Sequence, residues 1–117
     1  MVAGSFGATV RRERERQEIG LRQAAKAIGV SPTYLSMVER DEFQPPAEDK
    51  VRAIAKLLGL DEDELLALAG KVSSDLTDII KKNPREMASF LRSMKGMNPK
   101  QVSQRLAGPK PKKKESS

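Results

Sequence analysis

The stretch GVSPTYLSMVER, residues 29 to 40, predicts a tight turn followed by a short helix. Gly29 can adopt the positive φ that ends a preceding helix, and the serine-proline pair beginning at Ser31 is typical of a helix start. Helical spacing places Leu35 and Val38 on one side. The opposite side carries Thr33, Ser36, Met37 and Arg40. Because this outer face is small, polar and almost uncharged, whereas surface helices normally carry charge, we expect it to contact a partner.

The residues before the turn predict a second helix that packs closely against its neighbours. In LRQAAKAI, residues 21 to 28, apolar side chains recur at helical spacing, and Ala24 and Ala25 are small enough to let another helix approach. A helix, a glycine turn and a second helix form the layout of the helix-turn-helix motif. A short second helix with a small polar face fits the DNA major groove, where long charged side chains would contact phosphate indiscriminately.

Helical periodicity continues on both sides of this motif, and no segment alternates as a strand would. We predict helices from about Phe6 to Gln17, around the stripe from Val51 to Leu58, and in DEDELLALAG, where Asp61 is the expected cap. Three further helix candidates follow residue 70: SSDLTDIIKK, NPREMASFLRSMKG and NPKQVSQRLAG.

The last two candidate helices share one predicted start. Asn83 and Asn98 are each followed by proline and, three residues after the asparagine, by Glu86 or Gln101. This order predicts a cap, a proline at the first helical position and a capping-box partner at the third.

The composition excludes several classes of function. The 117 residues include no cysteine and no histidine, which removes thiolate chemistry, the usual zinc sites and the commonest general base. The acidic runs DEDE and RERER suit helix starts and solvated faces. We therefore expect no enzyme activity, no metal and no cofactor. No apolar run is long enough to cross a bilayer, and the start MVAGSFGATVRRER lacks a signal-peptide core, so we expect a cytoplasmic protein without a membrane partner.

The net charge of +6 favours an anionic partner. Residues 109 to 117, PKPKKKESS, contain four lysines and one glutamate, so half of the excess lies on an end that we expect to be a disordered, lysine-rich tail. The folded part is only mildly basic, and charge alone therefore does not establish nucleic-acid binding.

Residues 6 to 69 resemble the Cro and phage-repressor (XRE) family of helix-turn-helix regulators. The resemblance rests on VRRER, LRQAAKAIGVSPTYLSMVER, the PP of the following loop and VRAIAKLLGLDEDELLALAG. It implies an all-α fold with a five-helix, lambda-repressor-like domain that binds double-stranded DNA as a homodimer on a two-fold symmetric operator. We expect a DNA-binding domain at 1–70, a helical dimerisation or accessory segment at 71–108 and the tail at 109–117.

The resemblance also implies roles for particular residues. Positions that face bases in the family are occupied here by Pro32, Thr33, Ser36 and Met37, and positions that touch the sugar-phosphate backbone by Ser31, Tyr34 and Arg40. Arg14 and Glu39 match a structural ion pair between the first helix and the end of the third. Four of these residues have plainer structural alternatives. Tyr34 could cover the hairpin edge, Met37 could fill a gap, and Arg14 and Glu39 could be solvated charges.

Two positions depart from the family pattern. Gly20 and Leu21 stand where a capping Ser or Thr and a phosphate-binding Gln are common, so Arg22 or Gln23 must substitute in that contact. Asp41 stands where glycine is common, and we expect its carboxylate to point away from phosphate.

An apolar stripe after residue 70 leaves two interpretations open. Met87, Phe90, Leu91 and Met94 fall on one side of their predicted helix. They could form an intramolecular core with the five-helix domain, or a dimerisation seam. We favour the seam, because five short helices already bury most of their own stripes and a symmetric operator needs a fixed two-fold axis.

These features together predict a small dimeric transcriptional regulator, more specifically a repressor that occupies its operator and blocks transcription. One alternative is an antitoxin-like protein whose residues 71–107 bind a partner protein while the first domain regulates its own promoter. Another is an activator that touches polymerase with the acidic DEDE segment.

Overall fold

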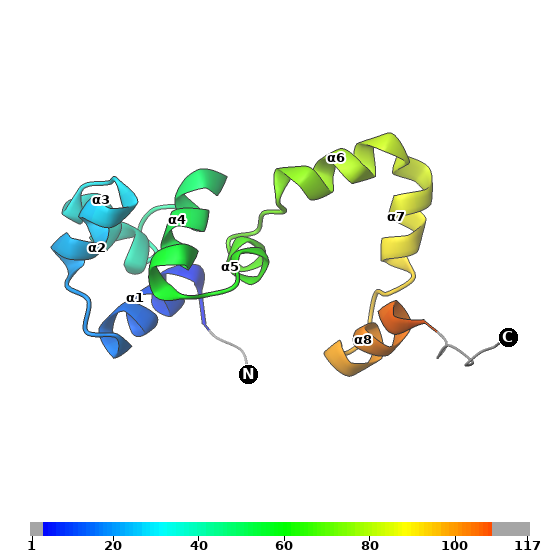
Figure 1. Ribbon diagram of the computed structural model, residues 1–117, viewed down its shortest axis with the longest axis horizontal. Helices are drawn as coiled ribbons and strands as arrows, with labels where there is room; N and C mark the ends of the chain where they lie inside the picture. The colour runs from blue at the N-terminus through cyan, green and yellow to red at the C-terminus, as the bar shows by residue number, and fades with distance from the viewer. Residues whose placement is uncertain (1–3, 109–117) are drawn as a thin grey trace, which may run out of the picture. The chain divides into compact units, whose positions relative to one another are not determined.

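The computed structural model describes residues 4–108, and within them it contains α-helices and no strand (Figure 1). The helices are α1 (Phe6–Arg16), α2 (Leu21–Ile28), α3 (Pro32–Glu39), α4 (Glu48–Leu58), α5 (Glu62–Leu68), α6 (Ser74–Lys82), α7 (Pro84–Arg92) and α8 (Pro99–Ala107). The predicted all-α class is confirmed. The tail expected at 109–117 lies outside the described residues.

The chain divides into two compact units. The first unit ends at Thr77 and the second begins at Asp78, so the division falls inside α6, a few residues after the boundary expected at residue 70. No helix in the described part of the chain is both long enough and apolar enough to span a bilayer. Residues 4–108 also bring together no group of three acidic side chains that could hold a metal ion.

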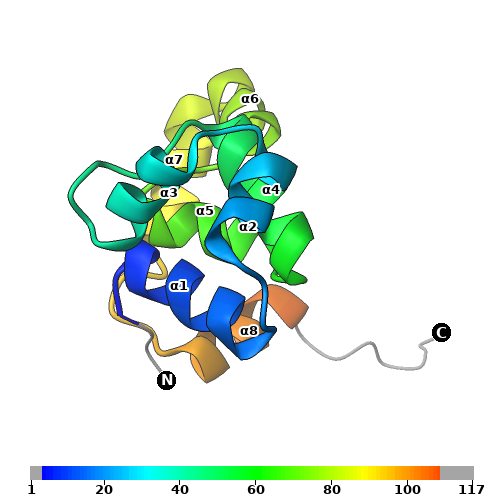
Figure 2. The ribbon, with the colours of Figure 1, turned by 90° about the vertical axis from the view of Figure 1, so that its left-hand side faces the viewer.

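A single hydrophobic core joins α1 to α5 in the first unit. The stripes predicted for α2 and α4 face it, and α3 contributes Leu35 and Val38. Its other members are Phe6, Val10, Ala24, Ala25, Ile28, Val51, Ile54, Ala55, Leu58, Leu65 and Leu66. Figure 2 shows α2 and α4 side by side within this unit. Because Leu35 and Val38 point into the core, the opposite side of α3 is left facing solvent.

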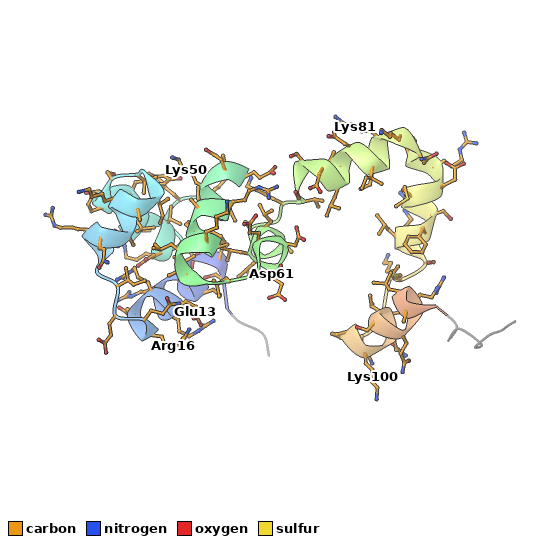
Figure 3. The ribbon with its side chains drawn as sticks, viewed as in Figure 1. Glu13, Arg16, Lys50, Asp61, Lys81 and Lys100 are labelled. Atoms are coloured by element: carbon orange, nitrogen blue, oxygen red, sulfur yellow. The ribbon has the colours of Figure 1, made fainter. Side chains whose placement is uncertain are left out.

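The turn between α2 and α3 adopts the conformation that its glycine predicts. Gly29 follows α2 with φ of 88°, a left-handed value at which a side chain would be strained. The Nζ of Lys50, labelled on α4 in Figure 3, donates to the carbonyl oxygen of Ile28 at 3.3 Å. The last turn of α2 is thereby tied to α4, which fixes the point from which α3 starts.

Close approach of α1 to the end of α3 depends on Gly7. A Cβ at Gly7 would lie 2.3 Å from the carbonyl oxygen of Val38 and 2.7 Å from that of Glu39. Both are backbone atoms, so a methyl group there cannot be accommodated by turning a side chain. Glycine is therefore required at this point of α1, although alanine is intrinsically the better helix former.

Replacing Gly7 with alanine is expected to destabilise the protein by about 1–3 kcal/mol, because α1 and α3 must separate. Gly4→Ala is the matched control, since its Cβ would meet only the side chain of Ala8 at an ordinary 3.7 Å. Urea unfolding followed by circular dichroism measures both variants. Equal midpoints for the two variants would show that the approach of α1 to α3 tolerates a methyl group.

The N-terminus of α1 is capped from two directions. The Oγ of Ser5 accepts from the backbone N–H of Ala8 at 3.1 Å and donates to Oδ2 of Asp41 at 2.5 Å. The backbone N–H of Gly7 donates to Oδ1 of Asp41 at 3.1 Å. Asp41 has a left-handed φ of 59°, which explains why glycine also suits this position. Its carboxylate lies at the positive end of the α1 dipole, where a negative charge is favourable.

The start of α6 is hydrogen-bonded to α4 within the first unit. The backbone N–H and the Oγ of Ser74 donate to Oε2 of Glu48 at 3.3 and 3.2 Å. Nη2 of Arg52 donates to the Oγ of Ser73 at 2.5 Å, and Nη1 donates to Glu62 at 3.0 Å. The hydrogen bond from Arg52 lowers the pKa of Glu48, which keeps this carboxylate charged.

The two asparagine starts differ. At α8, the Oδ1 of Asn98 accepts from the N–H of Gln101 at 2.8 Å, and the Gln101 side chain accepts from the N–H of Asn98 at 3.0 Å, so the predicted capping box is confirmed. At α7 the predicted proline at the first helical position is confirmed, but the predicted cap is wrong, because Asn83 has φ −139° and ψ 65° and its side chain makes no capping bond. Asn83 is the only residue between α6 and α7, and its ψ is far from the extended value of an N-cap such as Asn98.

Candidate nucleic-acid interface

The outward side of α3 is uncharged along the helix. Thr33 is exposed, and Pro32, Tyr34, Ser36 and Met37 are partly exposed. The Oγ of Ser31 accepts from the backbone N–H of Tyr34 at 3.0 Å, so the predicted cap with proline at the first helical position is confirmed. The cap orients the first turn of α3 and leaves the Thr33 side chain directed outward.

A hollow of about 300 Å³ lies between the beginning of α2 and the outer face of α3. It is lined by Leu21, Arg22, Pro32, Thr33, Ser36 and Arg40. Five of these are residues that the sequence assigned to DNA contact, and the fold brings them together from two helices. Gln23 is exposed on α2 outside this hollow, so Arg22 is the better placed substitute for the missing glutamine at Leu21.

Tyr34 and Met37 lie at the side of this surface. The ring of Tyr34 is 5.7 Å from the ring of Phe43, measured between centroids, and inclined by 40°. Tyr34 also packs against the hydrophobic core. Met37 is partly buried on the same helix. A DNA contact by either side chain stays a prediction.

Arg14 and Glu39 form a buried, bidentate ion pair. Nε of Arg14 donates to Oε2 of Glu39 at 2.7 Å, and Nη2 donates to Oε1 at 2.9 Å. Only 11% of the Arg14 side chain and 3% of the Glu39 side chain are exposed, so these are not solvated charges. Nη1 of Arg14 also donates to the carbonyl oxygen of Ile19 at 2.8 Å. The hydrogen bonds that Arg14 donates to the Glu39 carboxylate raise the pKa of Arg14.

This ion pair positions the candidate interface by joining α1 to the end of α3. It ties α1 to the last residue of α3, and the bond to Ile19 fixes the loop that leads into α2. Arg40 follows immediately and is exposed at the end of α3. The pair therefore sets the distance between the two helices that line the hollow.

The apolar stripe of α7 is accessible in the second unit. Phe90 is 43% exposed and Leu91 is 49% exposed, while Met87 and Met94 are partly exposed. No residue of α6, α7 or α8 is fully buried. Met87, Phe90 and Leu91 belong to α7, whereas Met94 follows the end of the helix at Arg92, so the predicted stripe runs past α7 into the next turn.

Comparisons with known proteins agree with this geometry. A sequence model of the helix-turn-helix domain family matches residues 5–68. The chain is also 39% identical over 64 residues to an uncharacterized HTH-type transcriptional regulator of Mycobacterium tuberculosis, with the match covering 55% of this chain and 45% of the relative. The chain thus spans just under half the length of the curated relatives that it matches.

Two solved structures share the fold. The DNA-binding domain of the P22 c2 repressor, determined in solution, is 30% identical, with a TM-score of 0.50 over 62% of this chain and 92% of that one. A chain of the SinR–SinI protein complex matches 87% of this chain and 91% of its own length, with a TM-score of 0.50. Its 21% identity makes it evidence for the fold alone.

The fold is that of a helix-turn-helix domain of the repressor-like class. Since the family match extends over more than half of its residues, the chain belongs to the helix-turn-helix family. The resemblance to Cro and phage repressors seen in the sequence is confirmed.

Proposed function

We propose that the protein is a sequence-specific transcriptional regulator that represses by occupying a two-fold symmetric operator as a homodimer. The observation that carries this proposal is the surface of α3, where Thr33 and Ser36 share a hollow with Arg22 of α2 and Arg40. Hydroxyl groups donate to and accept from base edges, while arginines bind phosphate. The hollow thus combines hydroxyl groups that can contact base edges with arginines that can bind the DNA backbone.

The accessible stripe of α7 supports the dimeric part of the proposal. Phe90 and Leu91 expose large apolar surfaces, which are costly in water unless a partner covers them. A second copy of the same stripe forms a self-complementary seam around a two-fold axis. Two linked domains then bind two half-sites, and the linkage raises affinity for the full operator.

Selection of bound sequences from a random DNA pool, using the purified 117-residue chain, tests the proposal directly. We expect an enriched site with two inverted halves, and a mass in solution that corresponds to two chains. An enriched site with one half and a monomeric mass would contradict dimeric operator binding. Copurification of a second protein in place of a second copy would support the antitoxin-like alternative.

Thr33→Ala is expected to weaken binding to the selected operator by about 1–3 kcal/mol while leaving binding to random DNA little changed. Thr33 is exposed, so its loss should not disturb the fold. Arg22→Ala is the matched control, because a phosphate contact contributes equally on both kinds of DNA. Fluorescence anisotropy with the two duplexes separates the effects. Equal losses on both duplexes for Thr33→Ala would contradict a base-reading role.

A further inference from the structure

A second hollow lies beside the first on the same face of the helix-turn-helix domain. It has a volume of about 220 Å³ and is lined by Arg11, Arg14, Leu21, Ser36, Glu39 and Arg40. Leu21, Ser36 and Arg40 also line the hollow between α2 and α3. The two hollows are therefore adjoining parts of one surface, and the second extends this surface onto α1.

The lining of the second hollow is strongly basic. It contains three arginines and one glutamate, an excess of two positive charges. Glu39 is occupied by Arg14, so its carboxylate does not neutralise Arg11 or Arg40. Nη1 and Nη2 of Arg14 each carry two hydrogens. Nη1 donates one hydrogen bond to Ile19 and Nη2 donates one to Glu39, so each nitrogen keeps a second N–H group. Such a lining attracts an anion.

The two exposed arginines of this hollow are held only by surface ion pairs. Nε of Arg11 lies 3.2 Å from Glu15, with both side chains more than half exposed. Nη2 of Arg40 lies 3.2 Å from Glu42, with both side chains half exposed. Exposed pairs of this kind are worth less than about 1 kcal/mol. Both arginines can therefore exchange their carboxylate partner for a stronger anionic ligand at little cost.

We propose that this second hollow binds a backbone phosphate of DNA, and that Arg11 brings α1 into the DNA interface. The inference rests on the proposed DNA-binding function and adds a contact that neither the sequence motif nor the α2–α3 surface assigns. The volume corresponds to several water molecules at about 30 Å³ each, which is room for a phosphodiester group. Arginine is suited to binding phosphate, because its planar guanidinium group donates two parallel hydrogen bonds to phosphate oxygens.

Arg12 provides a matched control for Arg11. It is the next residue of α1, carries the same charge and is exposed, but it lines neither hollow. A general effect of removing one positive charge from α1 therefore appears in both variants, whereas a phosphate contact appears only in Arg11→Ala. The weak ion pair of Arg11 means that its removal should leave thermal stability almost unchanged.

The test measures the affinity of the 117-residue chain for a short duplex of random sequence over a series of salt concentrations. Arg11→Ala should reduce the slope of log K against log salt by about 0.9, the value for one phosphate, and weaken binding roughly fivefold at physiological salt. Arg12→Ala should keep the wild-type slope. Glu15→Gln, which releases Arg11 without removing it, should bind at least as tightly as the wild type.

Equal slopes for Arg11→Ala and Arg12→Ala would overturn the phosphate site. The result is separable from a failure of the proposed function, because Arg22→Ala, which lies only in the hollow between α2 and α3, would still lower the slope. If the wild-type chain itself binds neither random nor selected duplexes, the proposed function and the phosphate site fail together.

Discussion

Glu39→Ala is expected to lower the free energy of unfolding by about 3 kcal/mol, because the guanidinium of Arg14 then stays in the protein without its carboxylate. The Glu39 side chain is only 3% exposed and accepts two hydrogen bonds from Arg14. Removal of one partner of a buried pair costs more stability than the intact pair contributes, since the remaining charge stays buried with neither solvent nor an ion-pair partner. For a small domain, the melting temperature should fall by more than about 10 °C.

Thermal unfolding followed by circular dichroism measures this effect, and Glu15→Ala is its matched control. Glu15 pairs with Arg11 within α1 but is more than half exposed, so its removal should cost less than about 1 kcal/mol. The double variant Arg14→Ala with Glu39→Ala should be less unstable than the sum of the two single variants, because no unpaired charge then remains. A Glu39→Ala melt that overlays the wild type would mean that Arg14 is satisfied without Glu39.

The same substitution should weaken DNA binding through geometry. Glu39 lines the phosphate hollow but not the hollow that contains Thr33, and it fixes α1 against the end of α3. We expect affinity measured well below the melting temperature to fall even where the protein is folded. This separates a positioning role from simple loss of the folded state.

The sequence was sufficient to predict the helix-turn-helix core because its signals are local. The stripe of α2, the positive φ of Gly29 and the cap at Ser31 each follow from residues within one or two turns of one another. The capping box at Asn98 is equally local and is confirmed. Asn83 is likewise followed by proline and by a possible capping-box partner, Glu86, but it is the single residue between α6 and α7. Its side chain does not form the cap that the local sequence predicts.

Long-range contacts were the part that sequence reasoning missed. Asp41 caps α1 from more than thirty residues away, and Gly7 is required by the backbone of α3 rather than by its own helix. The phosphate hollow likewise depends on Arg11 and Arg40, whose positions in the sequence give no sign that they line one space. The ion pair of Arg14 and Glu39 was anticipated only through resemblance to a family, since neither residue stands out in its own segment.

The largest expected effect on DNA binding belongs to Phe90→Glu. Phe90 lies in the stripe with Met87, Leu91 and Met94, and it is 43% exposed in the single chain, so a charge there should leave the folded chain intact. At a two-fold seam the same substitution places two carboxylates in one desolvated interface. The dimer should therefore dissociate. The two half-sites then bind independently, and affinity for the full operator should fall by a factor of roughly 10² or more.

Ser89→Glu is the matched control for this prediction, because it adds the same charge at the neighbouring exposed position of α7 but outside the stripe. Light scattering should give one chain for Phe90→Glu and two chains for Ser89→Glu, with identical helical circular dichroism. Affinity for an isolated half-site should be the same in both, since the α3 surface is unchanged. A Phe90→Glu protein that is folded and still dimeric would exclude the seam. Unfolding of that variant would show that the stripe is intramolecular core, and the dimer would then have to form through another surface.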